Sequence, residues 1–149
     1  MSSVKVSDLF KNSENWYNFY AHFYNYKLCG DLPDIFGRDA ELDLDDMHHI
    51  HLAANEAVQA RWRAARIQHR RTTDRDHPEE DYWLIYAFEP LRDEYLLVTI
   101  IGPDAHLRQE WGSYLRDLSE QIVEPWVLGR IVYTDPDEED EEVLEAEDN

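Results

Sequence analysis

Two apolar runs separated by a short turn constrain the fold of this chain most strongly. Tyr82–Phe88 and Tyr95–Ile101 are rich in β-branched and aromatic residues, and Pro90–Asp93 between them is typical of a turn. Continuous apolar runs of this length predict buried strands, and so short a connection requires the two strands to pair antiparallel. Met47–Ile67 is consistent with one helix by periodicity alone, but Met47–Ala53 also alternates as a third strand. With that strand, the three segments together predict an antiparallel meander.

Helical patterns flank the meander on both sides. Asn12 or Ser13 offers an N-cap for an aromatic-rich helix, and Gly30 stands where a C-cap glycine belongs. After the hairpin, a second helix is predicted between Pro103 and Pro125. Its apolar residues recur at spacings of three and four: Leu107, Trp111, Leu115, Leu118 and Ile122. The expected fold class is therefore α+β, with an antiparallel sheet of three to four strands packed by N-terminal and C-terminal helices.

Three further segments have weaker patterns. Val4–Phe10 is apolar enough for a short first strand, and Trp126–Tyr133 is consistent with either a last strand or an arm packed against the sheet. Residues 32–40 contain Pro33 and Gly37, which interrupt regular structure. We therefore predict a packed loop there, anchored by apolar side chains.

The charge of the chain is strongly negative and unevenly distributed. The net charge is −19, and residues 135–149 carry ten acidic residues and no basic one. Such a block repels itself, so we expect residues 1–134 to form a single domain and residues 135–149 to form a disordered acidic tail. Binding of nucleic acid would then require a local basic patch, because phosphate contacts depend on positive charge.

The cysteine content and hydropathy exclude several classes of protein. Cys29 is the sole cysteine, which excludes a disulfide framework and a cysteine-based zinc site. The sequence lacks an apolar run of 18 residues and a signal-peptide pattern at its start. We therefore expect a cytoplasmic protein.

Histidines supply the first candidate chemistry. In a strand, His49 and His51 point to the same side and lie about 7 Å apart. Such a pair suits acid–base catalysis, phosphate binding or a metal, or is simply a pair of surface histidines. A third ligand at a recognisable spacing is missing, so no metal site is predicted. His106 occupies the first turn of the C-terminal helix, where a neutral base or a phosphate contact is favoured.

Arginines supply the second candidate feature. Six of the fourteen basic residues lie within fifteen positions, with Trp62 interleaved, as is common at nucleic-acid interfaces. They are Arg61, Arg63, Arg66, Arg70, Arg71 and Arg75. Pairing with the nearby acidic residues 74–81 is the alternative explanation. Tyr86 is either a core residue or a further RNA contact, if its hydroxyl reaches the face that carries the histidines.

Several common catalytic motifs are missing. The sequence contains no glycine-rich phosphate loop, no nucleophile elbow and no Cys–His pair. The commonest NTPases and hydrolases are therefore excluded.

Four stretches, in this order along the chain, resemble the YafO family of toxins from bacterial toxin–antitoxin systems. They are Asp31–Ala40 (DLPDIFGRDA), His49–Ala53 (HIHLA), Arg71-Thr72 ahead of Leu84–Tyr86, and His106 after the last strand. The first stretch is long and unusual enough to make the resemblance specific. The similarity extends from about residue 20 to about residue 120 and also suggests the broader RelE-like toxin fold.

The resemblance implies a ribosome-dependent endoribonuclease that cleaves translated mRNA and is neutralised by a cognate antitoxin. In this reading His49, His51 and His106 are the acid–base residues. Arg70 or Arg71 contacts phosphate, and no cofactor is needed. The implied reaction is attack of the 2′-oxygen on the adjacent phosphorus, which leaves a 2′,3′-cyclic phosphate and a 5′-hydroxyl.

Two alternatives remain open. The scaffold of a toxin with an acidic surface is also consistent with a non-catalytic interaction protein that mimics nucleic acid. A metal-dependent nuclease using His49 and His51 is the other alternative. The catalytic interpretation depends on a strand at 47–53, because in a helix these two side chains diverge by about 200°.

Overall fold

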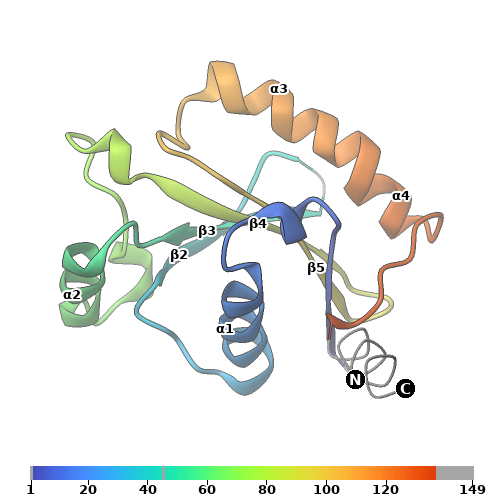
Figure 1. The fold of residues 1–149 in the computed structure, drawn as a ribbon, viewed down its shortest axis with the longest axis horizontal. Coiled ribbons are helices and arrows are strands. Elements are labelled where there is room, and N and C mark those ends of the chain that lie inside the picture. Colours follow the sequence, from blue (N-terminus) through green and yellow to red (C-terminus); the bar gives the residue numbers. More distant parts are fainter. Residues whose placement is uncertain (1, 45, 137–149) are drawn as a thin grey trace, which may run out of the picture.

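Five strands form one sheet in the part of the chain that the computed structural model describes, residues 2–44 and 46–136, with the backbone alone at 108–110. The strands are β1 Ser3–Val6, β2 Phe36–Glu41, β3 Met47–Leu52, β4 Tyr82–Glu89 and β5 Glu94–Ile101. Their order is β1-β5-β4-β3-β2 (Figure 1). β1 runs parallel to β5, and the other pairs are antiparallel. The predicted meander of β3, β4 and β5 is confirmed.

Helices cover both faces of the sheet (Figure 1). α1, Trp16–Cys29, lies on one face, and α2, Glu56–Ala64, lies beyond the end of β3. α3, Arg108–Leu118, continues through a π-helical turn at Ser119–Val123 into α4, Glu124–Val127, and lies on the other face. The described residues also form single 3₁₀ turns at Phe10–Asn12, Gln68–Arg70 and Pro78–Glu80. The mixed α+β class and the N-terminal and C-terminal helices are therefore confirmed.

The two faces of the sheet bury separate groups of side chains. The α1 face includes Val6, Phe23, Ile50, Leu84 and Leu97. The α3 face includes Met47, Ile85, Val98, Leu115 and Trp126. Alternation along β3 and β4 assigns successive residues to opposite groups, as a pleated strand requires. This division decides which of the candidate side chains lie on the same face.

The strand count of three to four was too low because two strands fall in weakly patterned sequence. Val4 and Val6 are buried in β1, so the apolar opening is a strand as predicted. Residues 36–40, predicted to be part of a packed loop, belong to β2. Gly37 permits this: its Cα lies so close to the neighbouring segment that an added Cβ would be 2.3 Å from the Arg71 carbonyl oxygen. Glycine and charged residues have low strand propensity, so pairing rather than propensity forms β2.

The segment after α3 is helical instead of a strand. Trp126 lies in α4, and Pro125 is in the first turn of that helix, where a missing N–H costs little. Residues 128–135 form no strand, but Tyr133 packs against the α3-face core. The arm interpretation of this segment therefore holds from residue 128, and the strand interpretation is wrong.

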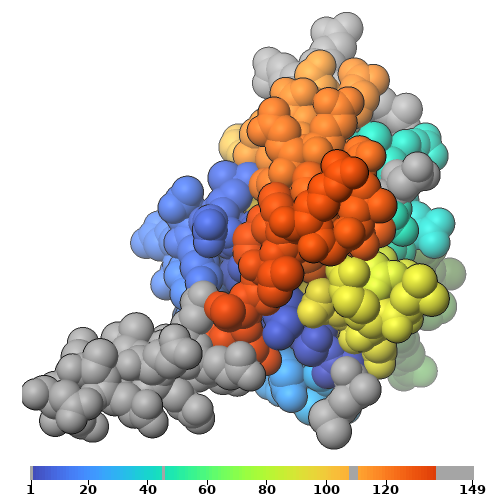
Figure 2. Space-filling model, turned by 90° about the vertical axis from the view of Figure 1, so that its right-hand side faces the viewer, coloured from blue at the N-terminus to red at the C-terminus, as the bar shows by residue number. Residues whose placement is uncertain are grey.

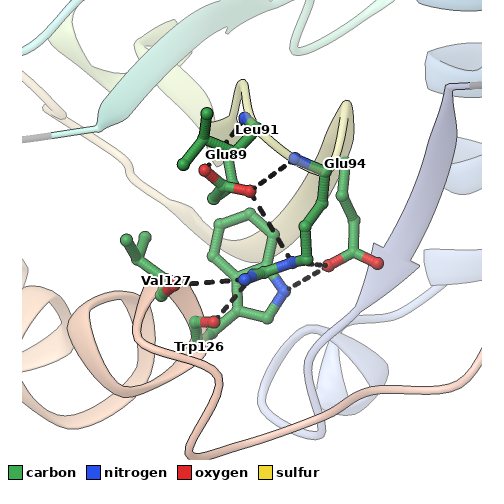
Figure 3. Close-up of polar contacts among 6 residues, drawn as sticks. Glu89, Leu91, Glu94, Trp126 and Val127 are labelled. Atoms are coloured by element: carbon green, nitrogen blue, oxygen red, sulfur yellow. Dashed lines mark hydrogen bonds and ion pairs between the residues drawn. The ribbon is translucent and has the colours of Figure 1, made fainter.

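Arg92 in the β4–β5 turn joins the hairpin to the C-terminal helix through Trp126 and Val127, which Figure 3 labels. Its two terminal nitrogens donate to the backbone oxygens of Trp126, at 2.8 Å, and Val127, at 3.2 Å. Its Nε lies 3.5 Å from Glu94 Oε2, which also accepts the Trp126 indole N–H at 2.9 Å. Glu89 Oε2 accepts the Arg92 backbone N–H at 2.7 Å. The carbonyls at a helix C-terminus lack hydrogen-bond donors in their own helix, and here the Arg92 guanidinium donates to two of them.

The predicted acidic tail lies almost wholly outside the described residues. Asp135, its first residue, accepts a hydrogen bond from the Tyr20 hydroxyl of α1 at 3.3 Å. The start of the segment therefore lies against α1. The disorder predicted for the remainder falls on residues 137–149, which the structure does not describe.

Candidate active site

A cavity of about 570 Å³ lies where β2 and β3 meet the loop before β4 and the loop after β5. It is lined by Arg38, His51, Thr72, Thr73, Asp74, Arg75, Pro78, Asp81, Asp104 and His106. Two predicted residues, His51 and His106, come together here, with ring centroids 5.5 Å apart. Basic, imidazole and carboxylate groups from four separate chain segments therefore surround one space, the arrangement expected of a catalytic site.

His106 is held by Asp81. The Asp81 side chain is buried, and its Oδ2 accepts the His106 backbone N–H at 3.0 Å and contacts Nδ1 of the ring. The His106 side chain is 58% exposed. A carboxylate on Nδ1 favours the tautomer that carries its proton there, which leaves Nε2 as the nitrogen available to a substrate. The pair therefore forms a positioned acid–base group.

His106 lies in the loop before α3 and not, as predicted, in the first turn of that helix, because α3 begins only at Arg108. This loop is pressed against the segment that carries Asp81. Ala105 donates its N–H to the Asp81 carbonyl at 3.2 Å, and Asp104 donates to the Pro78 carbonyl at 2.8 Å. Gly102 has a φ of 139° and would place a Cβ only 2.5 Å from the Tyr82 ring. Glycine is needed for this conformation and this approach, so the geometry of the pair is built into the backbone.

His49 and His51 lie on the same side of β3, as predicted, with ring centroids 5.4 Å apart. Both rings pack on Trp83, at 4.1 Å for His49 and 5.6 Å for His51. Burial lowers the pKa of His51 to about 3 and that of His49 to about 4. Both imidazoles are therefore neutral at pH 7. His51 lines the cavity and His49 does not.

The lowered pKa values of His49 and His51 predict that the folded chain is less stable in acid. Their pKa values are lower in the folded chain than the ordinary 6.5, so the unfolded chain binds more protons between pH 6.5 and about 4. The free energy of unfolding should fall by up to about 1.4 kcal/mol per pH unit for each histidine over this interval. Urea unfolding of wild type and His51→Gln between pH 7 and 4.5 measures how the free energy of unfolding depends on pH. If the free energy of unfolding falls equally steeply with falling pH in both proteins, His51 does not have the lowered pKa.

Arg38 is a cavity residue that the sequence patterns did not reveal. It lies half-buried on β2, and its Nε donates to the His69 carbonyl at 2.7 Å. That bond aims the side chain along the cavity wall and leaves the terminal nitrogens of the guanidinium as potential phosphate donors. Arg75 lines the same cavity and is exposed. Two guanidinium groups are thus available in the cavity.

The predicted RNA-binding arginines are spread over a wider region. Arg61, Arg63, Arg66 and Arg70 are exposed on α2 and the segment after it, and none of them lines the cavity. Arg63 forms an ion pair with Asp34, with Nε 2.7 Å from Oδ2. Arg71 is buried, and its Nη1 donates to the Pro33 and Phe36 carbonyls at 3.1 and 3.0 Å. The Arg71 guanidinium therefore fastens the start of β2 and is not placed to receive a phosphate.

Tyr86 lies on the opposite face of the sheet from His49 and His51. Its ring stacks on His48 at 5.0 Å, and its hydroxyl donates to Asp39 Oδ1 at 2.7 Å. The other Asp39 oxygen accepts from the Tyr26 hydroxyl and from Lys27 Nζ at 2.7 and 2.8 Å. The expectation that Tyr86 reaches the face of His49 and His51 is wrong. β3–β4 pairing makes Tyr86 the partner of His48, and paired residues lie on the same face of a sheet. It belongs to a polar network beneath α1.

Comparison with known proteins decides the family. A family model described as Toxin YafO, type II toxin-antitoxin system, matches residues 24–127. The match covers more than half of the 149 residues and includes every residue that lines the cavity. The chain belongs to the YafO toxin family. Comparisons with curated proteins and with solved structures gave no match.

Membership in the YafO family makes this chain a toxin of a toxin–antitoxin system, for which an antitoxin is the partner. Among the described residues, no helix is both long and apolar enough to cross a membrane. Within the same part of the chain, no three histidine, cysteine, aspartate or glutamate side chains are grouped so that they could hold a metal ion.

Proposed function

We propose that this YafO-family toxin is a ribosome-dependent endoribonuclease that cleaves translated mRNA without a metal ion. The observation that carries the proposal is the cavity, which is lined by the His106 ring, held by Asp81, by a second imidazole and by two arginines. These groups supply both requirements of ribose-assisted cleavage: proton transfer and stabilisation of charge on phosphorus. The RelE-like fold suggested by the sequence is consistent with the meander and C-terminal helix but remains a proposal.

The reaction needs two proton transfers. The 2′-oxygen attacks phosphorus as its proton passes to a base, and the bond from phosphorus to the 5′-oxygen breaks as that oxygen takes a proton from an acid. The products are a 2′,3′-cyclic phosphate and a 5′-hydroxyl. In our assignment, Nε2 of His106 is the base, and Arg38 and Arg75 bind the phosphoryl oxygens.

His51 is assigned as the acid. Its ring is neutral in the free protein because burial lowers its pKa to about 3. A phosphate anion in the cavity stabilises the imidazolium, so RNA binding itself promotes protonation of His51. His49, which packs behind His51 on Trp83, is assigned a positioning role. The exposed Arg61, Arg63, Arg66 and Arg70 are proposed to contact the RNA or ribosomal backbone outside the cavity.

Primer extension on mRNA translated by purified ribosomes tests the function. We expect cuts only when ribosomes are present, no inhibition by a chelator that removes transition metals and leaves Mg²⁺, and 2′,3′-cyclic phosphate at the new ends. Inhibition by the chelator would instead support a metal-dependent nuclease. A protein that cuts nothing under any of these conditions would contradict the proposal and favour the nucleic-acid mimic.

A further inference from the structure

A second cavity of about 520 Å³ adjoins the candidate active site and differs from it in chemistry. It lies between the β2–β3 connection and α3, which Figure 2 shows side by side in teal and orange. Its apolar lining is Leu42, Leu44, Trp83, Ala105, Trp111 and Leu115. We call it the aromatic groove. His106 lines both cavities, so its imidazole lies where the two adjoin.

We propose that the aromatic groove binds one nucleobase of the RNA, that of a nucleotide adjoining the scissile phosphate. A ribonucleotide joins an anionic phosphate to a flat apolar ring through a single sugar. The two cavities present matching surfaces on either side of His106: guanidinium groups in one and indole rings in the other. This inference rests on the proposed function, because it assigns the base that accompanies the phosphate cleaved there.

Trp111 is fixed in a position suited to stacking. Its indole N–H donates to the Asp104 carbonyl at 3.1 Å, in the loop that also carries His106. Tyr114 meets the Trp111 ring edge-on at a centroid distance of 6.0 Å. A ring held by its polar edge loses little freedom when a base stacks on it, so the stacking free energy is retained in binding.

The groove also supplies polar groups for the edge of a base. Asp43 and Arg116, both exposed, line it together with the apolar residues. A carboxylate accepts from the amino groups of bases, and a guanidinium donates to their carbonyl oxygens. An apolar pocket with a few placed polar groups is typical of a small-molecule site. One base is therefore a better occupant than an extended protein segment, which would bring backbone groups needing partners.

Gly112 provides a direct way to fill the groove. It lies on α3 among the lining residues, and a Cβ added there would meet nothing within 4 Å. Gly112→Leu should therefore fold and occupy the space that the base needs. Ser113→Leu is the matched control, because Ser113 is the next residue of α3, is exposed and does not line the groove.

The test is titration of the full chain, labelled with ¹⁵N at the tryptophan indoles, with a 2′-O-methylated dinucleotide and with its abasic counterpart. We expect the Trp111 indole signal to shift with the complete dinucleotide. Removal of the base, or Gly112→Leu, should weaken binding by roughly five- to 100-fold. Ser113→Leu should bind as wild type does. Equal binding of the abasic probe, or unaltered binding by Gly112→Leu, would overturn the inference, as would the absence of dinucleotide binding.

Parallel mRNA cleavage assays separate this inference from the proposed function. If wild type cleaves mRNA and Gly112→Leu cleaves equally well, the subsite is wrong and the nuclease stands. If the dinucleotide binds through the groove but wild type cuts nothing, the subsite stands and the nuclease is wrong. If Gly112→Leu keeps dinucleotide binding and loses the antitoxin, the groove belongs to the antitoxin and the nucleobase inference is overturned.

Discussion

His106→Ala is expected to lower the rate of ribosome-dependent mRNA cleavage by at least about 100-fold, the usual range for loss of a general acid–base group. The His106 ring is the most exposed imidazole in the cavity and is held at Nδ1 by a buried carboxylate. The substitution removes that ring together with its edge-on contact to Trp83 of the α3-face core, at a centroid distance of 4.7 Å. Single-turnover cleavage of a defined mRNA, read by primer extension, measures the effect.

His22→Ala is the matched control for this loss. His22 is exposed on α1, which covers the opposite face of the sheet, so its removal should leave the cleavage rate within about two-fold of wild type. If His106→Ala retains more than about a tenth of the wild-type rate while it unfolds at the same urea concentration, His106 is not the base.

Asp81→Asn distinguishes a positioning role for Asp81 from a merely structural one. Asparagine keeps the shape of the side chain but removes the charge that favours the Nδ1-protonated tautomer. The rate should fall less than in His106→Ala, because the ring remains while the preference for the Nδ1-protonated tautomer is lost. A wild-type rate in Asp81→Asn would indicate that Asp81 only holds the loop, because the asparagine oxygen can still accept the His106 backbone N–H.

The sequence predicted the histidine face correctly because β3 alternates. In His49–Leu52, polar and apolar side chains alternate with a period of two, and this pattern places His49 and His51 together. The same reasoning does not apply to Tyr86. β4 is apolar on both faces, so its sequence contains no signal that says which side a residue faces. Only the pairing of His48 with Tyr86 decides it.

Asp81 and Arg38 were missed for different physical reasons. Asp81 ends an acidic run, and only the tertiary fold distinguishes its buried carboxylate from the exposed Glu79. Arg38 lies in a segment whose composition disfavours a strand, so the sequence does not indicate which face of the sheet its side chain is on. The resemblance to the YafO family implied that Arg70 or Arg71 contacts phosphate, and the arginine cluster that contains Arg71 was predicted to bind RNA. Burial, which composition does not report, gives Arg71 a structural position instead.

Gly37→Ala is expected to lower the free energy of unfolding by about 2–4 kcal/mol, among the largest effects of a single methyl group. The added Cβ would lie 2.3 Å from the Arg71 carbonyl oxygen and 2.9 Å from the Trp62 ring. The Arg71 carbonyl cannot move freely, because it accepts the Arg38 backbone N–H at 2.9 Å. β2 and the segment at Arg71 must therefore separate to admit the methyl group. Chemical unfolding in urea measures the loss.

Gly112→Ala is the control, since the same substitution there meets nothing within 4 Å and lies inside a helix. It should be neutral or stabilise the fold by up to about 1 kcal/mol. Gly37→Ala should also reduce cleavage at temperatures where it remains folded, because the next residue is Arg38 and its guanidinium would no longer be directed along the cavity wall. Equal stability of the two variants would show that β2 does not approach Arg71 this closely, and Arg38 would then lose its assigned place beside His51 and His106.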